Sequence, residues 1–327
     1  MAQKFWKFLV TPSTLEFIRE GKDTPGYSWF DALHGYVYAR WLYLYIGIGV
    51  GEHKAVKILA PVFRFVTALW RAISVGTRSR LSHQVQENAA RSKKAGIADT
   101  YHGKVLPLES AKRLVMVNEN VVLRDLEMVI PYAKARDIVL SNPQHILAME
   151  CPCRTARPDP CLPLDVCLVI GEPFAGFVAE HHPRRSRWIT QAEAIGILQA
   201  EDERGHVHHA FFKDAMLGRY YAICNCCACC CGAMQAHRRG TPMLASSGYV
   251  CQLDEMLCIG CGECTECCQF GALSLDSLTS RADLDKCMGC GVCIAHCTQG
   301  ALSLVRDASK GEPLEIIELL QKASAEL

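Results

Sequence analysis

Two cysteine-rich segments near the C-terminus align with each other without a gap, and this duplication limits the possible folds more than any other feature. Residues 258–275 read CIGCGECTECCQFGALSL, and residues 287–304 read CMGCGVCIAHCTQGALSL. Each segment contains four cysteines with the spacing C-x₂-C-x₂-C-x₃-C. Thiols this close in sequence seldom pair with one another as disulfides and often share a metal centre. The duplication therefore predicts a small module organised around metal ions.

The same spacing occurs in bacterial ferredoxins with two [4Fe–4S] clusters, in which the fourth cysteine of each run ligates the cluster of the other run. We therefore predict two clusters with crossed ligands. The first is held by Cys258, Cys261, Cys264 and Cys297. The second is held by Cys287, Cys290, Cys293 and Cys268. Glycines between the cysteines allow the backbone to turn tightly around the sulfur atoms and to direct N–H groups at them.

The duplicated segment departs from the ferredoxin pattern at two positions and contains an additional cysteine. Gln269 and Thr298 stand where a proline usually follows the fourth cysteine. Because this proline shapes the turn and provides no ligand, we expect both clusters to be retained. Cys267 is the additional residue, and the alignment assigns the ligand role to Cys268, so we expect Cys267 to be a buried thiol. Cys251 has no assigned role.

Ten further cysteines lie in the middle of the chain, more than one [4Fe–4S] cluster requires. Six of them fall within the motif CNCCACCCG, and this number exceeds the four ligands that zinc takes. We therefore predict one or two further iron–sulfur clusters, with a structural zinc domain as the alternative. Arg154 either donates a hydrogen bond to a cluster sulfur and balances thiolate charge, or lies on the surface. The predicted ligands are Cys151, Cys153, Cys161, Cys167, Cys224, Cys226, Cys227, Cys229, Cys230 and Cys231.

The combination of these motifs resembles a known group of proteins. The CPCR motif with its two following cysteines, the ICNCCACCCG motif and the two-cluster module are similar to an uncharacterised family of 4Fe–4S dicluster-domain proteins from anaerobic bacteria and archaea. The resemblance covers roughly residues 105–305. It implies electron transfer as a subunit or partner of a larger redox system, and it implies no substrate.

The predicted fold is an α+β protein in four segments. Thr190 and Glu193 form a capping box that begins a helix, which we expect to reach Arg204 and to stop at Gly205. Residues 206–212 then read as a strand. Histidines here are interpreted as structural or surface residues, because the cysteines offer softer ligands. The segments are an α-rich, basic N-terminal region (1–104), a cysteine-rich α+β domain (105–250), the two-cluster ferredoxin-like module (251–311) and a C-terminal helix (312–327).

The first third of the chain differs from the rest in charge. Residues 1–104 contain 15 Lys and Arg against 7 Asp and Glu, whereas the remainder contains 20 against 27. Within this third, four cations recur at every seventh residue of an apolar segment: Lys57, Arg64, Arg71 and Arg78. Seven-residue steps keep to one face of a helix, and basic amphipathic helices lie in membrane interfaces. Packing against a partner subunit is the competing interpretation.

An apolar, charge-free run at residues 41–51 is too short for a membrane-spanning helix, which needs roughly 20 residues. Its first part, Trp41–Ile46, reads as a strand, and glycines at alternate positions follow. A dinucleotide-binding fingerprint requires a glycine where this chain has Glu52, and the acidic residue expected about 20 positions later is absent. We therefore expect a tight turn or a close backbone contact rather than a nucleotide site.

Two classes of function remain. The first is a multi-cluster electron-transfer protein that serves redox partner proteins in a larger anaerobic complex. The second is an oxidoreductase with substrate chemistry at an unusual middle-domain cluster. The lack of a nucleotide, flavin or hydrolase motif favours the first class, and the surplus thiols favour the second. Nucleic acid is not an expected partner, because the cations are interleaved with apolar residues and do not form a phosphate-tracking face.

The location follows from the cysteines and the N-terminus. The first ten residues lack the apolar stretch and cleavage site of a signal peptide, and thiols that bind metal require reducing conditions. We expect a cytoplasmic protein that is peripheral on the inner face of the cytoplasmic membrane. Residues 1–80 would dock it there, on the membrane surface or on a membrane-bound, quinone-linked complex.

Overall fold

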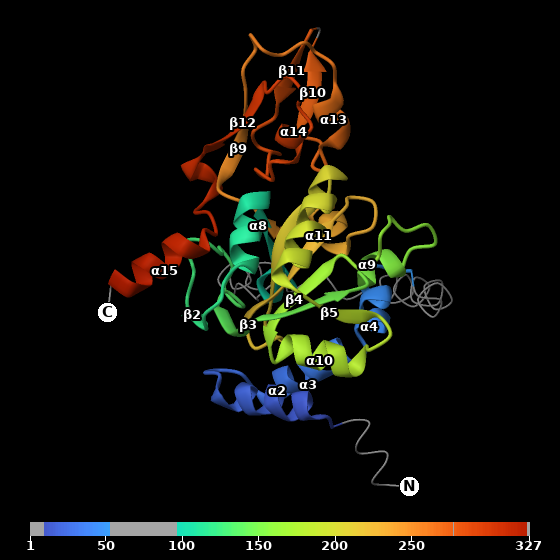
Figure 1. Cartoon of the computed structure of the whole chain (residues 1–327), viewed down its shortest axis with the longest axis vertical. Coiled ribbons are helices and arrows are strands. Elements are labelled where there is room, and N and C mark those ends of the chain that lie inside the picture. The colour runs from blue at the N-terminus through green and yellow to red at the C-terminus, as the bar shows by residue number, and fades with distance from the viewer. Residues whose placement is uncertain (1–9, 53–96, 277, 326–327) are drawn as a thin grey trace, which may run out of the picture.

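The computed structural model describes residues 10–52, 97–276 and 278–325. Figure 1 shows N-terminal helices at the bottom, a β-sheet with flanking helices in the centre, and a small cysteine-rich module at the top. The mixture of helices and sheets makes this an α+β structure, as the sequence predicts. The cationic series between residues 57 and 78 lies outside the described residues, so its helix stays a prediction.

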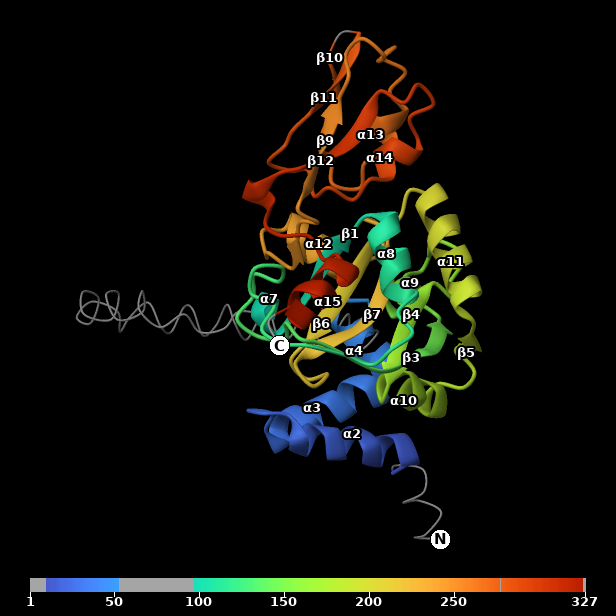
Figure 2. The same cartoon turned by 60° about the vertical axis from the view of Figure 1, so that its left-hand side comes forward.

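Three helices form most of residues 10–52 of the N-terminal region. Thr11 caps the first helix by accepting a hydrogen bond from the amide of Thr14, and Ser28 forms a capping box with Asp31 at the start of the second. The first two helices pack against α10 (Phe174–His181), below the sheet in Figure 2. The three helices are α2 (Pro12–Asp23), α3 (Trp29–Arg40) and α4 (Leu42–Gly49).

Helix α4 occupies the stretch that the sequence analysis assigned to a strand, so the expected strand at Trp41–Ile46 is wrong. Leu42 and Ile46 are four residues apart and lie on the same face of the helix, which lines the middle-domain cavity. A short apolar run does not distinguish a buried strand from a buried helix by periodicity, so packing decides. The expected tight turn follows, where Gly51 adopts a φ of 79°.

Among the described residues, an eight-stranded sheet forms the centre of the protein. Its spatial order is β2-β3-β4-β7-β6-β1-β8, and β5 also pairs with β3. The paired strands are antiparallel, except for β1 and β8, which are parallel. The predicted strand at residues 206–212 is confirmed as β6. The strands are β1 (Tyr101–Leu106), β2 (Val121–Leu123), β3 (Ile138–Met149), β4 (Cys167–Glu172), β5 (Ser186–Ile189), β6 (Val207–Lys213), β7 (Arg219–Cys226) and β8 (Leu244–Ala245).

Helices cover both faces of this sheet. On one face α8 and α11 lie side by side, and Asp202 of α11 approaches His208 of β6. On the other face α10 packs against β4, whereas α9 packs against α4 beside the cysteine-bearing ends of β4 and β7. A short helix precedes β1, and another follows β7. The helices are α7 (Ile97–Thr100), α8 (Leu108–Val115), α9 (Pro152–Thr155), α11 (Gln191–Glu203) and α12 (Gly232–Arg238).

The predicted capping box at the start of α11 is confirmed. The amide of Glu193 donates to Thr190 Oγ1 at 3.2 Å, and the amide of Thr190 donates to the Glu193 carboxylate at 3.0 Å. The helix ends at Glu203, and Gly205 follows with a φ of 76°. A left-handed residue is the usual way to stop a helix, and glycine adopts it without strain.

The C-terminal module consists of two small antiparallel sheets and two short helices. Strand β9 pairs with β12, and β10 pairs with β11. Each cysteine run continues into a short helix, α13 or α14, whose N-cap glycine has a φ of 84° in both repeats. The elements are β9 (Tyr249–Leu253), α13 (Glu263–Cys267), β10 (Leu273–Asp276), β11 (Thr279–Ala282), α14 (Val292–Ala295) and β12 (Leu302–Arg306).

The chain ends in the predicted region with a helix, α15 (Ile316–Ala325), after a 3₁₀ turn at Ala308–Lys310. Glu315 fastens the start of α15 to α8, because its carboxylate accepts hydrogen bonds from Ser110 and Arg113. Strands β1 and β9 run across residues 104 and 250, and the four segment boundaries stay a prediction. Among the described helices, none is both long and apolar enough to cross a membrane.

Candidate metal centres

Two cavities in the C-terminal module are each lined by three cysteines of one repeat and by the fourth cysteine of the other. The lining of the first cavity includes Cys258, Cys261, Cys264 and Cys297. The lining of the second includes Cys287, Cys290, Cys293 and Cys268, together with Cys251. The structure thus brings together each of the two ligand sets that the sequence predicts for this module. The four cysteines of each set therefore share one cavity.

Backbone amides point at four of these sulfur atoms. Ala272 N donates to Cys268 Sγ at 3.3 Å, and Ala301 N donates to Cys297 Sγ at 3.3 Å. The first cysteine of each run accepts a similar bond, from Ser280 N at 3.5 Å for Cys258 and from Cys251 N at 3.4 Å for Cys287. Such donors stabilise a thiolate relative to a thiol, and the Ser280 amide lowers the pKa of Cys258. The backbone around these four sulfur atoms therefore favours their charged form.

Close backbone approach at equivalent points of both repeats requires glycine. A Cβ atom on Gly260 would clash with the carbonyl oxygen of Leu278, and one on Gly289 would clash with that of Tyr249. Both glycines also have a positive φ. Larger residues at either position would push the cysteine loop away from its neighbouring strand.

Cys267 lies outside both sets. Its side chain is half-buried, so the expectation of a buried thiol is wrong in degree. Its Sγ lies 3.5 Å from the carbonyl oxygen of Cys264, and burial raises the pKa of Cys267 to about 12. Neither cavity of the module includes Cys267 in its lining, whereas the lining of one includes Cys268.

Six middle-domain cysteines, which we name the six-thiol group, line one side of a large cavity. Thiol contacts run from Cys224 to Cys167, on to Cys151 and Cys153, and then to Cys231 and Cys226. They come from the ends of β4 and β7, from the start of α9 and from the residue before α12. The cavity has about 770 Å³ of empty space, about twice that of either cavity in the C-terminal module. The six-thiol group consists of Cys151, Cys153, Cys167, Cys224, Cys226 and Cys231.

The rest of this cavity's lining is mostly aromatic and apolar. The hydroxyl groups of Tyr38 and Tyr221 are hydrogen bonded to each other at 2.9 Å, and Phe174 and Phe211 also line the cavity. Sequence inspection missed these residues, because they are dispersed between residues 38 and 221 and carry no motif. A hydrogen bond with Cys153, together with burial, raises the pKa of Cys151 to about 12. Metal binding here must therefore displace protons from the thiols.

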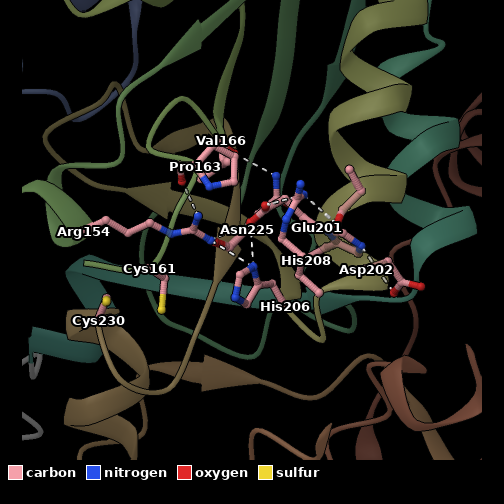
Figure 3. A network of polar contacts seen from close by, with 12 residues as sticks. Arg154, Cys161, Pro163, Val166, Glu201, Asp202, His206, His208, Asn225 and Cys230 are labelled. Carbon is pink, nitrogen blue, oxygen red and sulfur yellow. Dashed lines mark hydrogen bonds and ion pairs between the residues drawn. The ribbon is translucent and has the colours of Figure 1, made fainter. Parts of the chain in front are cut away.

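Arg154 lies beside the six-thiol group in a buried polar network, shown in Figure 3. Its guanidinium donates to the Glu201 carboxylate, to the carbonyl oxygen of Pro163 and to the carbonyl oxygen of Asn225. Glu201 also contacts His206 Nδ1 at 2.7 Å. Burial works against the charge of Glu201, but His206 and Arg154 lower its pKa.

Among the described residues, the Nε–H group of Arg154 has no partner, although Arg154 is only 1% exposed and lines the cysteine cavity. An unpartnered buried donor costs about 1–3 kcal/mol, so a sulfur acceptor in the cavity would relieve this cost. Of the two interpretations of Arg154 from the sequence, the surface residue is therefore wrong.

The remaining four middle-domain cysteines, which we name the four-thiol group, form a separate cluster. Their Sγ atoms all lie within 4.8 Å of one another. Cys229 is exposed, and Cys227 and Cys230 are buried. Burial opposes ionisation of Cys229, but hydrogen bonds from its three neighbours lower its pKa. The four-thiol group consists of Cys161, Cys227, Cys229 and Cys230.

None of the histidines near these centres is in the lining of the cysteine cavity. Three of them have hydrogen-bond contacts within the protein, whereas His209 is buried and neither of its ring nitrogens has a partner in the described part of the chain. His208 Nδ1 lies 2.6 Å from Asn225 Oδ1, and His182 Nε2 lies 2.7 Å from the carbonyl oxygen of Ala39. His181 Nε2 approaches the hydroxyl of Thr14 at 3.1 Å. These contacts agree with the structural interpretation of the histidines.

Residues 281–303 match the family model of the 4Fe-4S binding domain. This segment is an iron–sulfur domain. It contains Cys287, Cys290, Cys293 and Cys297, and the local structure fits a cluster, because amides point at two of these thiols and a cavity lies among three of them. No curated protein and no solved structure matches the chain significantly. The family match and the clustered cysteines make the chain an iron–sulfur protein, and electron transfer is the role they indicate.

Proposed function

We propose that the protein is a multi-cluster electron-transfer component with two [4Fe–4S] clusters in its C-terminal module. The observation that carries this proposal is the composition of the two module cavities, each with three cysteines from one repeat and one from the other. When bound, a [4Fe–4S] cluster supplies one-electron transfer. The amides that point at the sulfur atoms stabilise negative charge on each set and so help to determine its potential.

Further iron–sulfur chemistry in the middle domain completes the proposal. Its ten cysteines form no disulfides and gather at one end of the sheet, and eight of them line the large cavity. Arg154 supplies a buried positive charge and an unused donor at this cavity. These features suit one or two further clusters, with the structural zinc domain as the competing outcome.

Contacts between the two cysteine-rich regions support electron exchange between them. Gln269, which directly follows Cys268, accepts a hydrogen bond from the amide of Ala228 at 2.9 Å, between Cys227 and Cys229 of the middle domain. Arg238 donates to the carbonyl oxygen of Gln269 at 2.6 Å. The residue that replaces the usual proline therefore joins the two regions.

Metal and sulfide analysis of the anaerobically purified chain tests this function. The C-terminal module alone accounts for about eight irons and eight sulfides per chain, and middle-domain clusters raise both counts together. Reduction with dithionite should produce the EPR signals of magnetically coupled [4Fe–4S] clusters. A chain with fewer than eight irons, or with zinc and no acid-labile sulfide, would overturn the proposal.

The second candidate is an oxidoreductase with substrate chemistry in the middle-domain cavity. The observation that favours it is the hydrogen-bonded pair of Tyr38 and Tyr221, which line the same cavity as the six-thiol group and carry hydroxyls that can protonate a substrate as the cluster reduces it. Substitution of both tyrosines by Phe separates the two candidates. If the protein is an electron carrier, the variant keeps the wild-type rate of electron delivery to an artificial acceptor. If it is a reductase of this kind, a small molecule perturbs the spectrum of the wild-type protein on binding, and this perturbation disappears in the variant.

The proposed partners are redox proteins and a membrane surface or membrane-bound, quinone-linked complex on the cytoplasmic side. The charge asymmetry and the cationic series support residues 1–80 as the docking region. Within the described part of this region, large apolar side chains are exposed on neighbouring helices. They include Trp29, Phe30, Leu33, Trp41, Leu44 and Ile48.

A further inference from the structure

The ten middle-domain cysteines separate into two groups with different geometry. The six-thiol group forms a chain of neighbours along the cavity wall. The four-thiol group gathers around one point, with Cys161 contributed by the loop between α9 and β4 and the other three thiols by the loop between β7 and α12. Two segments that are far apart in sequence therefore converge through side chains of a single type.

The distances within the four-thiol group suit one metal ion. Cys161 Sγ lies 3.1 Å from Cys229 Sγ, Cys229 Sγ lies 3.6 Å from Cys230 Sγ, and no pair in the group exceeds 4.8 Å. A tetrahedral ion with metal–sulfur bonds of about 2.3 Å holds its thiolates about 3.8 Å apart. A cubane places each thiolate on a different iron and separates them more widely.

The C-terminal module provides an internal comparison. Its eight predicted ligands belong to the described part of the chain, and the second repeat matches the 4Fe-4S domain family. In neither of its cysteine sets do the Sγ atoms all lie as close to one another as they do in the four-thiol group. Within the described residues, the four-thiol group therefore has the close spacing of a single-ion site, and the two predicted cluster sets of the module do not.

We propose that the four-thiol group binds a single thiophilic divalent ion, Zn²⁺ or Fe²⁺, in a tetrahedral site, and that the six-thiol group alone holds the middle-domain iron–sulfur cluster. This inference rests on the proposed function, because it divides the middle-domain cysteines that the function assigns to clusters. Four thiolates around a divalent ion carry a net charge of about −2. Arg157 lies beside this charge, where its guanidinium donates to the carbonyl oxygen of Cys230 at 3.1 Å.

The ion would close one end of the cysteine cavity. Cys227 and Cys230 line the cavity of the six-thiol group, whereas Cys229 is exposed to solvent. An ion that joins these residues to Cys161 fixes two loops between the cavity and solvent. The ion therefore has a structural role: by holding the two loops together, it keeps water and oxygen from the buried cluster.

The test is metal and sulfide analysis of the full chain after anaerobic purification. Cys161→Ser and Cys229→Ser should each remove one zinc or one iron per chain and leave acid-labile sulfide unchanged. The matched control, Cys153→Ser in the six-thiol group, should instead remove several irons and sulfides together. Because the side chain of Cys229 is exposed, its replacement is the variant least disturbing to folding, which circular dichroism verifies.

Cobalt gives a second readout. Co²⁺ added to the zinc-free or iron-depleted chain should produce the thiolate charge-transfer and d–d absorption of a tetrahedral site, and Cys229→Ser should abolish it. Loss of about four irons and four sulfides in Cys161→Ser would show a cubane here and overturn the inference, while the proposed function would stand. Absence of acid-labile sulfide in the wild-type chain would instead overturn the proposed function.

Discussion

Cys251 and Ser280 occupy the same position in the two repeats of the C-terminal module. Each donates its backbone amide to the first cysteine of one run, Cys251 to Cys287 and Ser280 to Cys258. Each side chain also contacts the third cysteine of that run. Cys251 Sγ lies 3.7 Å from Cys293 Sγ, and Ser280 Oγ lies 3.1 Å from Cys264 Sγ. The cysteine that had no assigned role is therefore the counterpart of a serine that neighbours the other set.

This pair predicts different potentials for the two proposed clusters. A serine hydroxyl donates a stronger hydrogen bond to thiolate than a thiol does and favours the more negative, reduced state. Ser280→Ala should lower the potential of the cluster on Cys258, Cys261, Cys264 and Cys297 by a few tens of millivolts, and Cys251→Ser should raise that of the other cluster by a similar amount. EPR-monitored redox titration measures both. Unchanged potentials in both variants would contradict this role.

The crossed ligation predicts which cluster each fourth cysteine supports. Cys297→Ser should disturb the cluster whose remaining ligands are Cys258, Cys261 and Cys264, because Cys297 lines that cavity. Cys268→Ser is the matched control and should disturb the other cluster. In the Ser280→Ala background the affected potential identifies the cluster that is lost. The crossing is wrong if Cys297→Ser leaves the shifted potential in place and removes the unshifted one.

Gln269 predicts a coupling between the module and the middle domain. Gln269→Pro restores the residue that usually follows the fourth cysteine, so the module should keep its iron. It removes the acceptor of the Ala228 amide, and electron exchange between the two regions should slow by several-fold. Thr298→Pro changes the equivalent position of the other repeat, where the side chain accepts a hydrogen bond from the neighbouring Gln299, and should have no such effect. Stopped-flow reduction of the two regions measures the difference.

Arg154 and Arg204 both contact Glu201, and they differ in burial. Arg154→Gln removes the buried partner and should lower the free energy of unfolding by about 3–5 kcal/mol. Arg204→Gln removes the half-exposed partner, at 3.2 Å, and should cost less than about 1 kcal/mol. Anaerobic denaturant unfolding compares them. Similar losses of unfolding free energy in the two variants would show that the buried ion pair contributes no more to stability than the half-exposed pair.

The docking proposal predicts reversible binding to anionic lipid. Each surface cation near an anionic membrane contributes about 1 kcal/mol, so the chain should co-sediment with anionic vesicles, less so at high salt, and not with neutral vesicles. A variant with Lys57, Arg64, Arg71 and Arg78 replaced by Gln should lose this binding. If the chain does not bind vesicles and instead forms a stable soluble complex, the result supports the partner-subunit interpretation.

Local signals in the sequence were sufficient for several elements. The capping box at Thr190 and Glu193 and the stop at Gly205 depend on atoms within a few residues, so the pattern predicts the geometry directly. The cysteine runs of the C-terminal module can also be predicted from local spacing, because three of the four thiols of each set lie within seven residues. The duplication also indicates where the fourth thiol belongs. The apolar run at Trp41–Ile46 contains no such signal, and it forms a helix.

By itself, the sequence determined that the chain gathers thiols, that two runs share one pattern and that a helix begins at Thr190. Only the tertiary structure decided how the middle-domain thiols divide, because Cys167 and Cys224 become neighbours when β4 pairs with β7, and Cys161 meets Cys229 through a loop that closes over that pair of strands. The tyrosines that line the same cavity arrive from α3 and β7. Spacing along a chain encodes contacts within a few turns, whereas contacts between distant segments depend on which strands pair and which helices pack over them.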